Sequence, residues 1–178
     1  MQSKLIDKVL GEIRELNLKD SDLEDISDMA KLENLEVLLL DDNPIKDIEP
    51  ISELTNLKEL SLSNTKINNI TPLANLTNLE FLNISNCENL KGYFVLKNLK
   101  NLKVLNIAGN SIDSLSELYA LKIDIELDKL IIDFDFFETA GYQALQDTLF
   151  SDKNSLNIQS ENGQVTIDAT KKPHDVFN

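Results

Sequence analysis

The chain has 178 residues, of which 42% are hydrophobic, with 5 glycines and 4 prolines. This length and composition fit one globular domain and not a disordered chain. The formal net charge of −14 disfavours binding to nucleic acid or to an anionic membrane, and the single cysteine excludes an internal disulfide.

Residues 1–12 are expected to form an N-terminal helical cap. Ser3 can cap a helix that runs to about Ile13, and the apolar residues of this segment form one stripe that we expect to cover the start of the fold. Charged residues interrupt the apolar ones, so the segment lacks the apolar region of a secretion signal. This favours a cytoplasmic location; the alternative is a secreted or cell-surface protein whose signal peptide was removed.

One pattern occurs five times over residues 13–123. The copies begin at residues 13, 35, 57, 79 and 102, which gives steps of 22, 22, 22 and 23 residues. Two apolar residues separated by one, in the fourth and sixth places, predict a short strand with one face inward. Because a single coil cannot bury its own leucines, the copies are expected to stack as a parallel sheet over a continuous leucine core. The residue pairs are Leu16/Leu18, Leu38/Leu40, Leu60/Leu62, Leu82/Ile84 and Leu105/Ile107.

The ninth place of each copy holds a small residue that can mostly form hydrogen bonds. We expect these side chains to be buried and to satisfy backbone groups at the sharp turn after each strand, for which the asparagine amide fits best. Cys87 is therefore predicted to be a buried structural thiol and not a catalytic or redox group. The five residues are Ser21, Asn43, Thr65, Cys87 and Asn110.

The run LxxLxLxxNxIxxI resembles a leucine-rich repeat, and its 22-residue length, with Ile48–Ile51 and Ile70–Leu73, is similar to the bacterial internalin type. The resemblance implies an α/β leucine-rich-repeat solenoid, that is, a right-handed superhelix with a parallel sheet on its concave face. Pro50 and Pro72 predict short 3₁₀ turns or extended backbone on the convex side, because proline disfavours a long helix there. Such a fold does not by itself fix an activity.

The fourth copy has one residue more than the others. Gly92 is expected to absorb the resulting bulge, because glycine tolerates unusual backbone angles. Tyr93 and Phe94 then fall on or near the convex turn, with one of them exposed.

The register weakens after residue 123. A looser sixth copy can begin at Leu127 and extend to residue 136, with Leu130 and Ile132 inward. A separate capping strand over Leu130 to Phe136 is the alternative.

Residues 137–178 predict a C-terminal cap and a polar tail. A short helix is expected over residues 139–149. A hairpin is expected after it, because Asn162-Gly163 lies between two alternating runs.

Residues between the inward leucines should point to the concave face. Most are small and polar, whereas a few are large and apolar and lie beside acids, as is typical of a protein-binding patch. We predict that Leu39 and Phe81 are apolar anchors and that Asp41 and Asp42 attract a cationic group. The alternative is that a terminal cap folds across this face. The predicted partner-binding residues are Val37, Leu39, Asp41, Asp42, Glu59, Phe81, Asn83, Val104 and Asn106.

The sequence contains no pattern that indicates catalysis, a cofactor or a metal site. The single histidine, His174, lies in the polar tail, and there is no Gly-rich phosphate loop, CxxC or HExxH. The acids between residues 124 and 138 do not match a calcium loop. The sequence thus predicts a non-enzymatic module that binds a protein partner, and the charge favours a basic one. We consider a cytoplasmic inhibitor or immunity-type protein first, a secreted or surface adhesion module second, and an enzyme that uses the C-terminal cap third.

Overall fold

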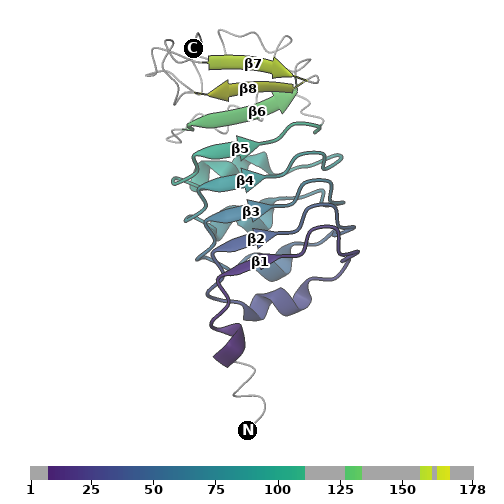
Figure 1. The fold of residues 1–178 in the computed structure, drawn as a ribbon, viewed down its shortest axis with the longest axis vertical. Coiled ribbons are helices and arrows are strands. Elements are labelled where there is room, and N and C mark those ends of the chain that lie inside the picture. Colours follow the sequence, from purple (N-terminus) through teal and green to yellow (C-terminus); the bar gives the residue numbers. More distant parts are fainter. Residues whose placement is uncertain (1–7, 111–126, 134–156, 162–163, 169–178) are drawn as a thin grey trace.

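The computed structural model describes residues 8–110, 127–133, 157–161 and 164–168. These residues build a solenoid in which strands lie side by side along the length of the molecule (Figure 1). The strand order in the sheet is β1-β2-β3-β4-β5-β6-β8-β7. The strands are β1 (Glu15–Asn17), β2 (Val37–Leu39), β3 (Glu59–Ser61), β4 (Phe81–Asn83), β5 (Val104–Asn106), β6 (Lys129–Asp133), β7 (Asn157–Glu161) and β8 (Gln164–Asp168).

Strands β1 to β6 are parallel and in register. Leu38 lies opposite Leu16 on one side and Leu60 on the other, so equivalent places of successive coils stack on one another. Leu105 lies opposite Leu130, so β6 continues the parallel ladder at the place of the predicted sixth copy. Residues 134–136, which belong both to that copy and to the alternative capping strand, lie outside the described residues.

The predicted hairpin strands are present at the C-terminal end. β7 and β8 pair in antiparallel fashion, and β8 also pairs with β6 in antiparallel fashion. The hairpin therefore extends the sheet edgewise. The helix predicted over residues 139–149 and the Asn-Gly turn lie outside the described residues.

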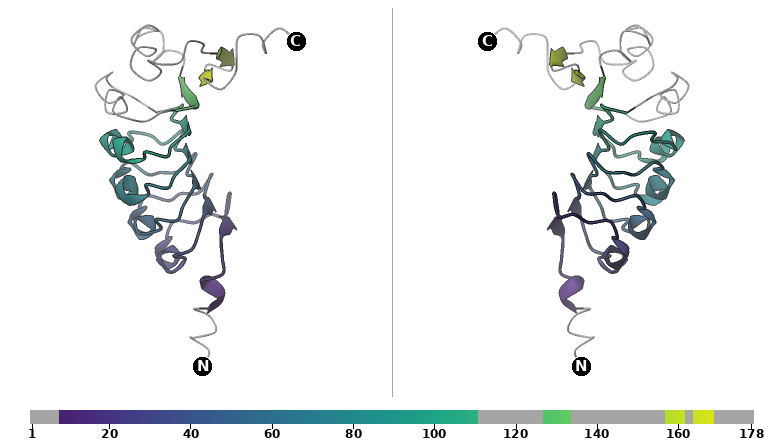
Figure 2. Two further views of the ribbon diagram at one scale, coloured as in Figure 1. Left: turned by 90° about the vertical axis from the view of Figure 1, so that its left-hand side faces the viewer. Right: turned by 90° about the vertical axis from the view of Figure 1, so that its right-hand side faces the viewer.

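Short 3₁₀ helices form the opposite side of the coils, as Figure 2 shows, and the described residues contain four of them. Pro50 and Pro72 occupy the first turns of the second and third helices, where the missing proline N–H leaves no partner unsatisfied. Short 3₁₀ helices were the expected form of this side. Their bounds are η1 (Ser27–Lys31), η2 (Glu49–Ile51), η3 (Thr71–Asn75) and η4 (Tyr93–Asn98).

One side-chain hydrogen bond leads into each of the first three 3₁₀ helices. A carboxylate or amide oxygen two residues before the first helical residue accepts that residue's backbone N–H, which forms an Asx turn. In the fourth coil the residue two before η4 is Lys91, whose side chain has no acceptor, and Gly92, with a φ of 92°, lies directly before η4. The three bonds join Asp25 to Ser27 at 2.8 Å, Asp47 to Glu49 at 2.8 Å and Asn69 to Thr71 at 3.0 Å.

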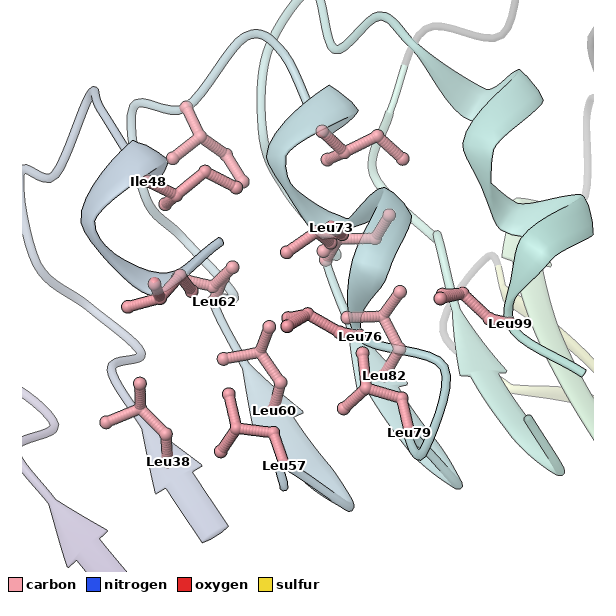
Figure 3. Packing of buried hydrophobic residues seen from close by; sticks show 14 of the residues in the cluster. Leu38, Ile48, Leu57, Leu60, Leu62, Leu73, Leu76, Leu79, Leu82 and Leu99 are labelled. Atoms are coloured by element: carbon pink, nitrogen blue, oxygen red, sulfur yellow. The ribbon is translucent and has the colours of Figure 1, made fainter. Parts of the chain in front are cut away.

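A continuous column of leucine and isoleucine side chains fills the space between the strands and the 3₁₀ helices (Figure 3). Leu38, Leu60 and Leu82, at the centres of three successive strands, are fully buried. Burial of a leucine side chain contributes about 1.5–3 kcal/mol, so the column is the main source of stability.

The column is less well covered at its N-terminal end. Residues 8–10 are helical, and Leu10 packs against the core, but Leu16 and Leu18 of the first coil are only partly buried. Val9 is 54% exposed. The expected cover of the first coil is thus partial among residues 8–10, and the remainder of the predicted helix lies outside the described residues.

The ninth-place side chains are buried in every coil after the first, as predicted. Asn43 accepts backbone N–H groups of Ser21 and Leu23, each at 3.0 Å, and its amide donates to the carbonyls of Leu18 and Leu40, each at 2.8 Å. Two coils of the solenoid are therefore joined through one amide group. Ser21 itself is exposed, contrary to expectation, because it lies in the first coil that the structure describes and no described coil covers it on that side.

Cys87 has the structural role that the sequence predicts. The thiol is buried, and its sulfur donates to the carbonyl of Leu62 at 3.3 Å. Burial raises the pKa of the Cys87 thiol, so the reactive thiolate is disfavoured.

Charges of alternating sign follow the second place of each coil. Lys58 Nζ lies 2.6 Å from Glu36 Oε2, and Lys103 Nζ lies 3.0 Å from Glu80 Oε2. If one coil were skipped, like charges would lie opposite each other, so this arrangement favours one register among similar coils. The residues are Arg14, Glu36, Lys58, Glu80 and Lys103.

Replacement of Lys58 by methionine is expected to lower stability at neutral pH and to have less effect in acid. The hydrogen bond and charge of Lys58 lower the pKa of Glu36 from its usual 4.5. A lowered pKa in the folded state contributes stability above pH 4.5 that is lost as the pH falls through the folded value. Urea unfolding of both proteins at neutral and acidic pH and low salt measures this difference.

The control is replacement of Lys91 by methionine, because Lys91 is exposed and has no ion-pair partner within the described part of the chain. Its effect should not change between the two pH values. High salt should weaken the Lys58 effect, since both partners are exposed. A Lys58 effect that is equal at neutral and acidic pH would contradict the expectation.

Candidate protein-binding surface on the sheet

The sheet face comprises the side chains of β1 to β6 that point away from the leucine core. Parallel pairing in register arranges them in rows that cross the strands, with about 4.8 Å between neighbouring strands. Each row thus joins residues from six coils into one surface. The third-place row is Glu15, Val37, Glu59, Phe81, Val104 and Lys129, and the fifth-place row is Asn17, Leu39, Ser61, Asn83, Asn106 and Ile131.

The apolar residues of the sheet face form two pairs. Val37 and Leu39 lie on β2, and Phe81 lies opposite Val104 across β4 and β5. The intervening strand β3 separates the two pairs, and it carries Glu59 on the same face. A partner that contacts both pairs must therefore cross a carboxylate.

Most of the predicted residues of this face are half-buried. We expected Leu39 and Phe81 to be exposed anchors, but neighbouring strands cover part of each side chain. The large hydrophobic side chains with high exposure, among the residues that the structure describes, are Val9 at 54% and Phe94 at 56%. The half-buried residues are Val37, Leu39, Glu59, Phe81, Asn83, Val104 and Asn106.

Asp41 does not offer a free carboxylate. Its side chain is buried, one oxygen lies 2.7 Å from Lys19 Nζ, and the other accepts the Ser63 backbone N–H at 2.9 Å and the Ser61 hydroxyl. The expectation that Asp41 attracts a partner's cation is therefore wrong. A buried carboxylate needs such internal partners, and here the adjacent coils supply them.

The partners of Asp41 belong to a polar network that extends across four coils. The Asn83 side-chain amide donates to the Ser61 hydroxyl at 3.0 Å, and the Ser85 hydroxyl donates to the side-chain oxygen Oδ1 of Asn83 at 2.8 Å. The hydroxyls of Ser63 and Ser85 lie 2.8 Å apart. This network fixes side-chain positions on the sheet face next to the apolar pairs.

Asp42 remains available to a partner. It is exposed, although one carboxylate oxygen accepts the Asn64 amide at 2.7 Å. Its φ of 60° also shows why the residue type occurs here, because Asp, Asn and Gly tolerate the left-handed conformation best. The eighth place has positive φ in all five coils, at Asp20, Asp42, Asn64, Asn86 and Gly109.

The sheet face is acidic in its N-terminal half. Glu15, Asp20 and Asp42 are exposed there, and Glu59 is half-buried. The next two strands carry apolar and amide side chains instead. A partner with a cationic group beside an apolar group would complement both halves.

The C-terminal hairpin strands do not cover the sheet face of β1 to β5. Strands β7 and β8 continue the sheet beyond β6, as Figure 1 shows. For the described strands, the alternative of a cap folded across this face is therefore wrong.

The described residues include no group of three or more His, Cys, Asp or Glu side chains that could hold a metal ion. In the same part of the chain, no helix has the length and apolar character needed to cross a membrane. His174 and most of the acids between residues 124 and 138 lie outside the described residues.

A comparison with known protein families also identifies leucine-rich repeats in this chain. The sequence profile of the family "Leucine Rich repeats (2 copies)" matches residues 33–75, 55–94 and 77–120. A search of curated proteins found no match.

Solved structures with the same fold include bacterial leucine-rich repeat proteins. An internalin (inlF) of Listeria monocytogenes matches with 26% identity and a TM-score of 0.58, over 71% of this chain and 44% of that protein. Internalin C2 of the same species matches with 35% identity and a TM-score of 0.56, over 64% and 50%. A Leptospira interrogans leucine-rich repeat protein matches with 25% identity and a TM-score of 0.57, over 71% and 35%.

The matched part of this chain spans half or less of the length of these proteins. Leucine-rich repeat domains generally mediate protein–protein interaction, and they are typically non-enzymatic. With its 22-residue coils, parallel ladder and short 3₁₀ helices, the chain is a leucine-rich repeat protein of the internalin-like type.

Proposed function

We propose that the chain is a non-enzymatic binding module that recognises a protein partner through its sheet face. The observation that supports this most directly is the in-register ladder, which holds two apolar pairs beside exposed acids. Docking on such a preformed surface loses little conformational entropy, because the strands and the polar network are already ordered.

The chemistry of the sheet face favours a basic partner. Asp42 and Glu15 attract a cationic side chain in the N-terminal half, while Phe81 and Val104 contact an apolar group in the C-terminal half. Charge complementarity of this kind raises the association rate and the specificity more than the affinity. The net charge of −14 acts in the same direction over longer distances.

Two cellular roles are compatible with such a module. An inhibitor or immunity-type protein in the cytoplasm that neutralises a basic effector suits the acidity of the chain. A secreted or surface adhesion module is favoured by the similarity to Listeria internalins. Fractionation of cells that express the natural gene separates the two roles by the compartment in which the protein is found.

The proposed surface is tested by capturing partners from extracts of the native organism with wild-type protein and with matched variants. Replacement of both Leu39 and Phe81 by serine removes the apolar anchors, and Asp42→Asn removes one exposed charge. Truncation of an interface anchor typically costs at least ~1 kcal/mol, so the double variant should lose most of the captured partner. Asp42→Asn should mainly reduce the association rate and its dependence on salt.

Phe94→Thr is the matched control, because it removes an exposed aromatic side chain on the opposite, 3₁₀ side of the coils. A partner that wild type and Phe94→Thr retain and the double variant loses would support the sheet face. Equal recovery with the folded double variant, as judged by circular dichroism, would rule out these anchors.

A further inference from the structure

A second surface feature, independent of the sheet face, lies between the third and fourth coils. It is a groove of about 480 Å³, which we call the coil-four groove. Two backbone hydrogen bonds hold its walls together: the Ile70 N–H donates to the Lys91 carbonyl at 3.0 Å, and the Lys91 N–H donates to the Asn68 carbonyl at 2.9 Å. The lining residues are Asn68, Asn69, Thr71, Asn89, Lys91, Gly92 and Phe94.

The coil-four groove forms where the repeat departs from its own rule. Lys91 stands where the first three coils have their Asx-turn residue, and Gly92 follows it beside Asn69. A Cβ atom at Gly92 would lie 3.0 Å from Asn69 Oδ1 and 3.1 Å from Thr71 Cγ2, and the φ of 92° adds strain for any side chain. Glycine therefore allows the backbone of this wall to lie close to Asn69 and Thr71.

Phe94 is the second feature in which the fourth coil differs from the first three. Eight residues before the start of the next coil, where the fourth coil has Phe94, the first three coils have the polar first residue of their 3₁₀ helices, whereas η4 begins one residue earlier, at Tyr93. Phe94 is 56% exposed, whereas its neighbours Tyr93 and Val95 are buried in the core. The ring thus adds apolar surface to the groove without adding to the core. The polar equivalents are Ser27, Glu49 and Thr71.

Two of the three asparagine side chains that line the groove are available to a ligand, whereas that of Asn69 is hydrogen-bonded to Thr71. The side-chain amides of Asn68 and Asn89 are exposed and make no hydrogen bond within the described part of the chain. Lys91 Nζ has no ion-pair partner among the described residues. No carboxylate lines the groove, although the chain has 31 acidic and 17 basic residues.

We propose that the coil-four groove binds a saccharide. A sugar ring has one apolar face, which can pack on Phe94, and a rim of hydroxyls, which can exchange hydrogen bonds with the Asn68 and Asn89 amides. A wholly apolar ligand would leave these amides unsatisfied, and an inorganic anion would make no use of the ring. The volume lies within the range of small-molecule sites.

Lys91 gives the groove a preference among saccharides. Its ammonium group is the charged group in a lining that otherwise consists of amides, a hydroxyl, glycine and phenylalanine. A sugar acid can place its carboxylate against this ammonium group and gain a charge-assisted hydrogen bond. We therefore expect a uronate to bind more tightly than the corresponding neutral sugar.

The test is an NMR titration of the ¹⁵N-labelled full chain with four probes: methyl glucoside, methyl galactoside, N-acetylglucosamine and glucuronate. Saturable shifts of the Asn68, Asn89 and Lys91 backbone amides are expected, with dissociation constants on the order of millimolar, as is usual for such small ligands. Phe94→Thr should weaken binding of every probe about tenfold, equivalent to loss of the ring contact. Lys91→Gln should weaken glucuronate selectively.

Val9→Ser is the matched control, because Val9 is the other highly exposed large hydrophobic side chain in the described part of the chain. It should leave the titration unchanged. Absence of saturable shifts with all four probes up to about 50 mM would overturn the proposal, and so would unchanged binding in folded Phe94→Thr. Equal affinity of wild type and Lys91→Gln for glucuronate would overturn the assigned preference for acids.

Discussion

Truncation of Leu60 to alanine is expected to lower the free energy of unfolding by about 3–5 kcal/mol, the upper range for a buried leucine. Leu60 lies at the centre of β3, is fully buried, and has coils stacked on both sides. Neighbouring coils can collapse into the resulting cavity only in part, because each is held by its own strand pairing. Chemical denaturation followed by circular dichroism measures the loss.

Leu16→Ala provides the matched comparison. Leu16 occupies the same place of the repeat, but in the first described strand and with only partial burial. Since the stability of a solenoid is approximately a sum of coil and nearest-neighbour terms, the end position should lose less than half as much. Equal losses at the two positions would show that the N-terminal end is as well packed as the centre.

Much of the fold could be predicted from the sequence because the coils repeat one physical requirement. A leucine pair separated by one residue fixes the inward face of each strand, and the same pair recurs 22 or 23 residues later. Asn43 could be assigned to the turn for a similar reason, since a buried amide meets both donors and acceptors. Pro50 and Pro72 likewise excluded long helices.

The environment of Asp41 could not be predicted by considering each coil separately. Its partners Lys19 and Ser63 are each 22 residues away in the sequence, and they become neighbours only because the ladder is in register. A comparison of residues one coil apart would have revealed this network. The same comparison would have shown the alternating charges of Glu36 and Lys58.

The half-burial of Leu39 and Phe81 could not be predicted for a different reason. Alternation along a strand states which face a side chain occupies, but not how far the next strands cover it. The coil-four groove had a sequence signal in Lys91 and the following Gly92, which occur where the earlier coils have Asp25, Asp47 and Asn69 followed by isoleucine. Its walls depend on backbone hydrogen bonds between coils, which the sequence alone does not show.

Asn43→Ala is expected to lower the free energy of unfolding by about 2–4 kcal/mol, more than most single polar substitutions. The change removes an amide that serves the backbone of two coils. The Leu40 carbonyl is buried and would lose this donor. Water can reach Ser21 and Leu23, which are less buried, and this keeps the expected loss below the sum of the separate hydrogen bonds.

Asn56→Ala is the control, because its amide is exposed and donates to a single carbonyl, that of Glu33, at 2.9 Å. We expect a loss below ~1 kcal/mol there. Hydrogen exchange supplies a second measurement: in Asn43→Ala the Ser21 and Leu23 amides should lose protection. The Asn43 amide also donates to the Asp41 carbonyl at 3.1 Å, so the same change should loosen the polar network of the sheet face. If Asn43→Ala lost no more stability than Asn56→Ala, the turn would be held by its backbone alone, and the ninth-place asparagine would not be what joins one coil to the next.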